Sequence, residues 1–145
     1  MALCAEYQTI CNTPLLIIKN DLKRVLVVDD EPDTCLVLKS VLEEDRFLVD
    51  SFNDPLLALK NFRASLYDLL LLDIKMPTMN GYELFIRIRN IDSKVKVCFL
   101  TALSEYQDYV GFKKNLSPVA VEKCVIAKPI DNGSLLDRIN GIIMS

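Results

Sequence analysis

The sequence contains no histidine, and this absence excludes several kinds of chemistry. Metal sites built on imidazole are ruled out, and so are acid–base or nucleophilic mechanisms that depend on a histidine side chain. The cysteines are odd in number, stand far apart and include no Cys-x-x-Cys pair, which favours reduced thiols over a disulfide framework or a zinc site. The five are Cys4, Cys11, Cys35, Cys98 and Cys124.

Basic clusters and long apolar runs are also missing. The chain has 17 Lys and Arg against 20 Asp and Glu, with a net charge of −3. No direct nucleic-acid contact is expected, because such domains usually carry a basic stripe on one face. Near the N-terminus only residues 15–18 form an apolar run, and no basic segment precedes it. The sequence therefore predicts neither a signal peptide nor membrane insertion, and favours a cytoplasmic location.

The 145 residues are enough for one domain and leave no room for a second of ordinary size. Hydrophobic residues make up 51% of the chain and charged residues 26%, which is typical of a globular protein with a buried core. We predict one domain over residues 23–145 and an extension of open role over residues 1–22. The apolar residues 15–18 are compatible with packing on the domain or with self-association, so a homodimer is an open alternative.

Short apolar runs alternate with amphipathic stretches after residue 22, which predicts five strand–helix pairs. The predicted strands are residues 24–28, 47–52, 69–72, 94–100 and 124–127. The predicted helices begin at Pro32 and Pro55, the second ending near Ser65, and continue with residues 81–90, 105–116 and a last one around 135–143. This alternation predicts a doubly wound α/β fold, (βα)₅, with a five-stranded parallel sheet.

Polar residues follow four of the predicted strands. Asp29 and Asp30 come after the first strand, Asp73 after the third, Thr101 after the fourth and Lys128 after the fifth. Because ligands of such folds bind beyond the carboxyl ends of the strands, we expect these side chains to share one crevice. Taken singly, each also has a structural interpretation, such as a helix cap or a turn with a solvated lysine.

The chemistry of this group points to phosphoryl transfer. Three carboxylates in one crevice repel one another, and a hard divalent cation relieves that repulsion. Mg²⁺ prefers oxygen ligands and takes one or two carboxylates together with phosphate oxygens. Asp73 can act as a nucleophile toward phosphorus, the Lys128 ammonium can offset charge on the phosphoryl oxygens, and the Thr101 hydroxyl can donate to one of them.

In chain order these positions resemble the receiver domain of response regulators, the CheY-like family of two-component signalling. The resemblance covers roughly residues 23 to 144. It rests on the Asp29-Asp30 pair, on residues 73–81 (Asp-Ile-Lys-Met-Pro-Thr-Met-Asn-Gly), on Thr101-Ala102 and on Lys128-Pro129. It implies a flavodoxin-like strand order of 2-1-3-4-5.

The resemblance also implies a role for each site residue. Asp73 would accept the phosphoryl group, with Lys128 and Thr101 in contact with it. The implied Mg²⁺ ligands are Asp30 directly, Asp29 through water, Asp73, and the backbone carbonyl of Lys75. Three further residues would shape the surrounding loops by their backbone conformations: Pro77, Gly81 and Pro129.

The implied function is a Mg²⁺-dependent switch rather than an enzyme in the usual sense, although such a domain can catalyse its own phosphorylation and dephosphorylation. A sensor histidine kinase or phosphotransfer protein would supply the phosphoryl group, and a downstream protein would recognise the altered surface. With no residues after Ser145, the expectation is an adaptor or phosphorelay role. The alternative is a pseudo-receiver that acts by protein contact without phosphorylation.

Two other functions are disfavoured by the residues after the first predicted strand. An aspartate-nucleophile phosphatase needs an Asp-x-Asp pair there, whereas this chain has Asp29-Asp30-Glu31. A flavin carrier needs a hydroxyl- and glycine-rich phosphate loop, and the acidic residues found here would repel phosphate.

The chain departs from the family pattern in two places. Val125 stands where the family usually has an aromatic residue that turns inward on activation. The stretch between Thr101 and Lys128 is also longer than usual, and residues 115–120 replace a small Gly-Ala pair. We therefore hypothesise that the signal passes through Thr101 and the surface of the predicted helix over residues 105–116, with Tyr106 or Tyr109 as aromatic contacts.

Overall fold

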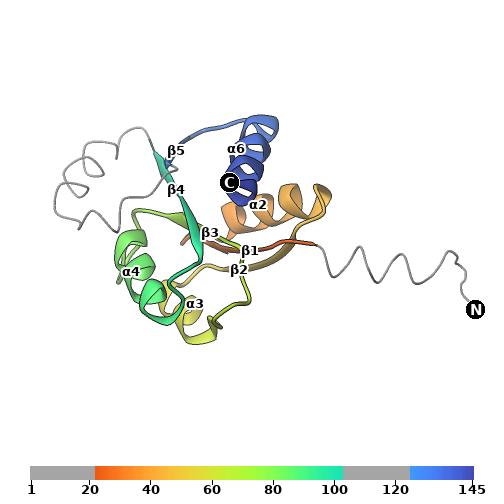
Figure 1. Cartoon of the computed structure of the whole chain (residues 1–145). Helices are drawn as coiled ribbons and strands as arrows, with labels where there is room; N and C mark the ends of the chain where they lie inside the picture. Colours follow the sequence, from red (N-terminus) through yellow and green to blue (C-terminus); the bar gives the residue numbers. More distant parts are fainter. Residues whose placement is uncertain (1–21, 103–124) are drawn as a thin grey trace, which may run out of the picture.

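A computed structural model of the chain describes residues 22–102 and 125–145. Its centre is a parallel five-stranded sheet in the order β2-β1-β3-β4-β5 (Figure 1). The strands are β1 (Arg24–Val28), β2 (Leu48–Phe52), β3 (Leu69–Asp73), β4 (Lys96–Ala102) and β5 (Val125–Lys128). The predicted fold class and strand order are confirmed.

Four helices lie within the described residues, two on each face of the sheet (Figure 1). α2 (Pro32–Glu44) and α6 (Asn132–Met144) pack on one face, and α3 (Pro55–Asn61) and α4 (Gly81–Ile91) pack on the other. The sheet is therefore the middle layer of three, and the carboxyl ends of its strands form one edge of that layer.

Local signals in the sequence explain where the helices begin. Pro32 is the first residue of α2, and the Asp54 side chain caps α3. At α4 the Asn80 side chain accepts from the Glu83 N–H while the Glu83 side chain accepts from the Asn80 N–H, which forms a capping box. Each cap satisfies backbone donors that have no partner within the helix.

β3 is the central strand and is buried on both faces. Leu70 and Leu72 belong to the core beneath α3 and α4, whereas Leu69 and Leu71 belong to the core beneath α2 and α6. All four are fully buried. A strand that is covered on both faces can be continuously apolar, as this one is, and it brings its last residue, Asp73, to the carboxyl edge of the sheet.

The predicted end of the second helix near Ser65 is wrong, because α3 ends at Asn61. Phe62 takes an extended conformation with φ −66° and ψ 139°. Its ring is buried and stacks on Tyr67 with 5.6 Å between the centroids. The burial of this aromatic pair turns the chain out of the helix earlier than the helical pattern predicted.

The fourth strand is also displaced from its predicted range of 94–100. The Lys94 N–H donates to the Asp92 side chain at 3.0 Å, so the chain is still turning there. At the other end, the last two residues of β4 pair with Ala127 and Lys128 of β5, which extends the strand to Ala102. β5 correspondingly ends at Lys128, one residue later than predicted.

Some predictions fall on residues outside those described. They include residues 1–21 of the predicted extension and the predicted helix over residues 105–116 with Tyr106 and Tyr109. Within residues 22–102 and 125–145, no helix combines the length and the apolar content that crossing a bilayer requires.

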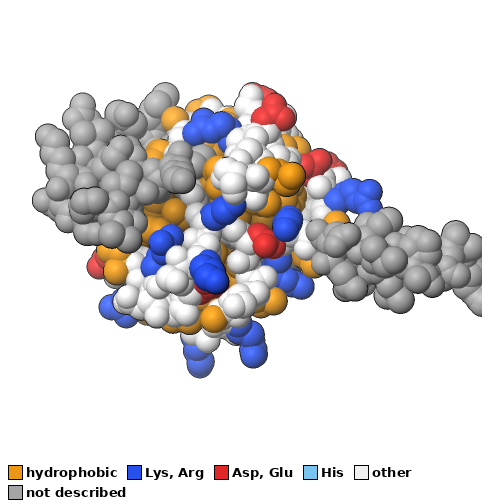
Figure 2. Space-filling view, viewed as in Figure 1, with side chains coloured by type: hydrophobic (Ala, Val, Ile, Leu, Met, Phe, Trp, Pro, Cys, Tyr) orange, Lys and Arg blue, Asp and Glu red, His pale blue; other side chains and the backbone are white. Residues whose placement is uncertain are grey.

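The outside of the layered core carries charged side chains with apolar ones between them. In the view of Figure 2 the Lys and Arg side chains project separately rather than as one continuous stripe. Large apolar side chains are nevertheless exposed on α2, where Leu36 is 65% and Val37 57% accessible. These two residues lie in the first half of the helix, close to the carboxyl edge of the sheet.

Candidate functional site

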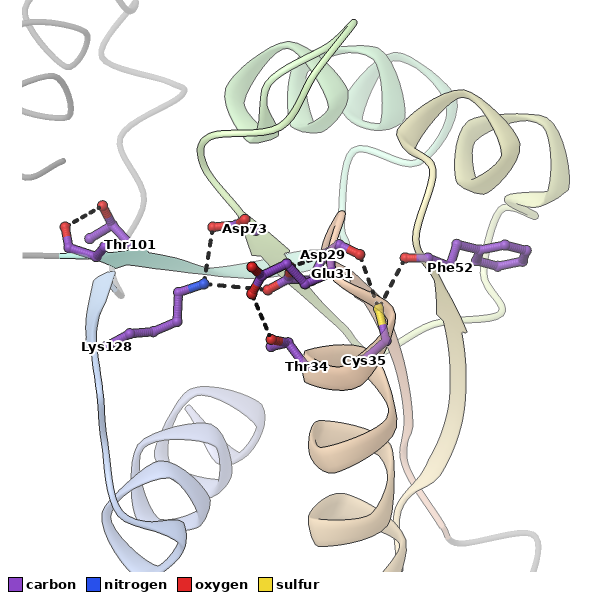
Figure 3. Close-up of polar contacts among 9 residues, drawn as sticks. Asp29, Glu31, Thr34, Cys35, Phe52, Asp73, Thr101 and Lys128 are labelled. Atoms are coloured by element: carbon purple, nitrogen blue, oxygen red, sulfur yellow. Dashed lines mark hydrogen bonds and ion pairs between the residues drawn. The ribbon is translucent and has the colours of Figure 1, made fainter. Parts of the chain in front are cut away.

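The carboxyl ends of β1, β3 and β5 bring three charged side chains into contact (Figure 3). The Lys128 Nζ lies 3.4 Å from the Asp29 Oδ2 and 3.5 Å from the Asp73 Oδ1. Asp29 is fully buried and Asp73 is 5% exposed, whereas Lys128 is half-buried. One ammonium group thus links carboxylates from two different strands.

Asp30 completes a cluster of three carboxylates. One oxygen from each of Asp29, Asp30 and Asp73 lies within 4.8 Å of the others. The Asp73 Oδ1 is buried and has no hydrogen-bond partner within the described part of the chain, the Lys128 ammonium being its neighbour at 3.5 Å. Three carboxylates beside one ammonium leave negative charge uncompensated, and the donor set consists of oxygen alone. Both features fit a hard divalent cation such as Mg²⁺.

Burial and mutual repulsion perturb the ionisation of these groups. Burial, followed by the charge of Asp29, raises the pKa of Asp73 from 3.8 to about 7, although the Lys128 ammonium lowers it in part. Burial also raises the pKa of Asp29, against the opposing effects of the Glu31 N–H and of Lys128. Burial alone would lower the pKa of Lys128, but the carboxylates of Asp73 and Asp29 outweigh it and raise that pKa. An added cation would favour the ionised form of both carboxylates.

Asp29 is held through all of its polar groups, and Figure 3 shows its contacts with Cys35 and Lys128. Its N–H donates to the Phe52 carbonyl at 3.2 Å, and its own carbonyl accepts from the Cys35 thiol at 3.1 Å. The carboxylate accepts from the Glu31 N–H at 3.0 Å through Oδ1 and from Lys128 through Oδ2. The backbone and the side chain of this residue are therefore both fixed by neighbouring segments.

Thr101 reaches the same edge of the sheet without joining this network. It is fully buried near the end of β4. Its hydroxyl donates to the Ala102 carbonyl at 3.2 Å rather than to Asp73 (Figure 3). A contact with a group on Asp73 would require the hydroxyl to change direction.

The loop after β3 is built tightly around Asp73. A Cβ atom at Gly81 would collide with the Asp73 carbonyl oxygen, and the Gly81 N–H donates to the Ile74 carbonyl at 2.8 Å. Glycine is therefore required for α4 to begin this close to Asp73. Lys75, Pro77 and Pro129 are exposed, and Pro129 follows Lys128 through a cis peptide bond.

A family model described as the response regulator receiver domain matches residues 25–140. The chain belongs to the response regulator receiver family. Receiver domains are regulatory domains of two-component response regulators rather than classical enzymes. The match spans every residue of the carboxylate cluster and Lys128.

Curated relatives of this receiver domain are transcriptional regulators. It is 33% identical over 120 residues to the transcriptional activator protein IrlR of Burkholderia pseudomallei, covering 83% of this chain and 50% of the relative. It is 35% identical over 123 residues to the CpxR homolog of Haemophilus influenzae, covering 84% and 51%. The chain thus spans about half the length of these curated relatives.

The receiver fold is also similar to solved structures. The response regulator protein TrrA of Thermotoga maritima, solved in complex with Mg²⁺-BeF, superposes with a TM-score of 0.68 at 31% identity. That similarity covers 83% of this chain and 99% of the other.

Within this receiver domain, Val125 stands at the position where the family usually has an aromatic residue. It packs at the margin of the core beneath α3 and α4 and is half-buried. From the sequence, Cys35 was expected only to be a reduced thiol, yet it contacts the backbone of Asp29. No periodic signal distinguishes a cysteine that contacts the site from one that only packs in the core, since both are buried on the same face of the helix.

Proposed function

We propose that Asp73 accepts a phosphoryl group in a Mg²⁺-dependent reaction and that this receiver domain acts as a phosphorylation switch in two-component signalling. The observation that carries the proposal is the contact of Lys128 with Asp29 and Asp73 beside Asp30. This arrangement supports the proposal, because the groups that would serve as nucleophile, cation ligands and counter-charge lie at one edge of the sheet.

The residues that would hold Mg²⁺ are the three carboxylates, together with the Lys75 carbonyl that the family resemblance adds. When bound, the ion supplies positive charge that neutralises phosphoryl oxygens and helps to orient them. The relative TrrA, whose structure contains Mg²⁺-BeF, supports this choice of metal. Within the described residues, the buried Asp73 Oδ1 has no hydrogen-bond partner, so it could accept a contact from a bound cation.

The remaining chemistry belongs to the protein. A carboxylate oxygen of Asp73 attacks phosphorus, the bond from phosphorus to the donor breaks with its electron pair leaving on the donor, and an aspartyl phosphate forms. The Lys128 ammonium, already 3.5 Å from Asp73, balances charge on the transferred group. The Thr101 hydroxyl turns away from the Ala102 carbonyl and donates to a phosphoryl oxygen. That rotation is the first movement of the switch.

The surface beside the site suits a protein donor. A groove of about 650 Å³ runs between α2 and the start of α6 and reaches Lys128. Val37, Leu38 and Leu135 line it, with Glu31 and Asp33 among its polar members. The exposed Leu36 lines a second hollow on the other side of α2, with Phe52 and Leu57, so that helix presents apolar side chains on both sides next to Asp73. We assign this surface to the sensor histidine kinase or phosphotransfer protein that supplies the phosphoryl group.

A small phosphodonor tests the proposal without any partner protein. Wild type, Asp73→Asn and Asp137→Asn would be incubated with acetyl phosphate and Mg²⁺, and the intact masses measured. We expect one phosphoryl group on wild type and on the control Asp137→Asn, at an exposed position on α6. We expect none on Asp73→Asn, and none on wild type in excess EDTA. An unmodified wild type would instead support the pseudo-receiver alternative, and an equal adduct on Asp73→Asn would place the acceptor elsewhere.

A further inference from the structure

Cys35 joins three segments of the chain at the edge of the candidate metal site. It lies in the first turns of α2 and is 6% exposed. Its thiol donates to the Asp29 carbonyl at 3.1 Å and also lies 3.4 Å from the Phe52 carbonyl at the end of β2 (Figure 3). The Cys35 N–H meanwhile makes an ordinary helical bond to the Glu31 carbonyl. The thiol therefore reaches beyond its own helix.

The Asp29 carbonyl has a particular need for a side-chain donor. Asp29 is fully buried, so an unpaired carbonyl there would lose its hydration without compensation. Three residues further on, where a tight turn would supply an N–H, the chain has Pro32, which has none. The buried Cys35 thiol supplies the hydrogen-bond donor that the backbone lacks at this position.

The carbonyl in question belongs to the peptide unit that links Asp29 to Asp30. A peptide unit is planar, so fixing its oxygen fixes the plane from which both residues extend. The Asp29 carboxylate is held separately by the Glu31 N–H and by Lys128. For Asp30, which is half-buried, the orientation of that plane determines where its side chain starts.

We infer that Cys35 is a positioning residue, whose thiol holds the Asp29–Asp30 peptide unit so that the two carboxylates face Asp73 at the spacing a Mg²⁺ ion requires. This inference rests on the proposed function and adds a residue that acts through the ligands rather than touching the metal. Outer partners that orient metal ligands commonly change metal affinity about 10- to 100-fold when they are removed.

Substitutions at Cys35 separate positioning from simple packing. Cys35→Ala removes the donor and some volume, whereas Cys35→Ser restores a donor while remaining small and polar. Cys98, a second buried cysteine located in β4, provides the matched controls Cys98→Ala and Cys98→Ser. Isothermal titration with Mg²⁺, at a temperature where circular dichroism shows every variant folded, measures the affinity. Thermal unfolding in EDTA measures stability separately.

We expect Cys35→Ala to lose about tenfold in Mg²⁺ affinity, and Cys35→Ser to recover most of it even though both variants are less stable than wild type. Both Cys98 variants should bind Mg²⁺ like wild type. Equal affinities for Cys35→Ala and Cys35→Ser, or an equal loss in Cys98→Ala, would overturn the positioning role and leave the proposed function intact. A wild type that binds no Mg²⁺ would overturn both.

Discussion

The Lys128 Nζ lies 3.5 Å from the Asp73 Oδ1, although the two residues end different strands that are not neighbours in the sheet. The same nitrogen is 3.4 Å from Asp29, at the end of β1. The Lys128 side chain therefore reaches across β4, which lies between β3 and β5. Its charge stabilises two carboxylates that would otherwise repel each other. The positive charge of Lys128 has two opposing effects, because it favours the ionised form of Asp73 and disfavours a bound cation.

Replacement of Lys128 should separate these two effects. In Lys128→Met we expect tighter Mg²⁺ binding, because a competing positive charge is lost, and phosphorylation by acetyl phosphate slowed about 100-fold, because charge on the transferred group is no longer balanced. Titration calorimetry and the time course of intact mass measure the two quantities. Lys60→Met, at an exposed position on α3, should change neither. If Lys128→Met lost both Mg²⁺ binding and phosphorylation by acetyl phosphate, this prediction would be wrong.

The raised pKa of Asp73 predicts a pH-dependent stability in the absence of metal. Since the folded state raises this pKa from 3.8 to about 7, the native protein binds more protons than the unfolded chain between these values. The contribution of Asp73 to stability is therefore fully present below pH 3.8 and is lost as pH rises through about 7.

Asp73→Asn mimics the protonated acceptor and should not show this loss. The Asn amide carries no charge for burial to penalise, but it also loses the ion pair with Lys128. We therefore expect the variant to be more stable than wild type by about 1–2 kcal/mol at pH 8 in EDTA, with little difference near pH 4. Urea unfolding at both pH values measures the difference, and saturating Mg²⁺ should reduce it. A difference that is independent of pH would exclude ionisation of Asp73 as the cause.

Thr78 has a strained backbone in the loop after Asp73. Its φ of 72° lies in the left-handed region, which β-branched residues rarely adopt. Thr78→Asn should stabilise the protein by roughly 0.5–1 kcal/mol, because Asn tolerates this conformation better. Thr78→Val, which keeps the branched Cβ, is the control for urea unfolding. An equal gain in Thr78→Val would mean that strain at this φ is not the reason.

The apolar surface on α2 should matter for a protein donor and not for a small one. Leu36→Asp places a charge at a position that is 65% exposed, so the fold should tolerate it. We expect at least a tenfold slower transfer from an autophosphorylated sensor histidine kinase that phosphorylates the wild type, because a charge opposes docking of an apolar surface. The rate with acetyl phosphate should be unchanged.

Ile91→Asp is the matched control for this surface, since Ile91 is 50% exposed at the end of α4 on the opposite face of the sheet. It should leave both rates unchanged. If Leu36→Asp also left kinase transfer unchanged, the donor would dock elsewhere.

Much of the fold was predictable because its signals are local. The apolar run of β3 and the helix starts at Pro32 and Pro55 each depend on signals within a few residues, and all three are confirmed. The early end of α3 was not predictable, since it depends on Phe62 stacking against Tyr67 after the chain has turned. The direction of the Thr101 hydroxyl likewise depends on its surroundings in the folded chain and not on its place in the strand.

The sequence by itself determined which residues stand at the carboxyl ends of the strands, because strand length and the alternation of strands and helices are written in local patterns of apolar residues. Only the tertiary structure decided what those residues touch. Lys128 and Asp29 are separated by 99 residues, and their contact exists only once β1, β3 and β5 lie in one sheet. The raised pKa of Asp73 and the thiol bond from Cys35 to Asp29 have the same origin, since burial and distance are properties of the packed chain.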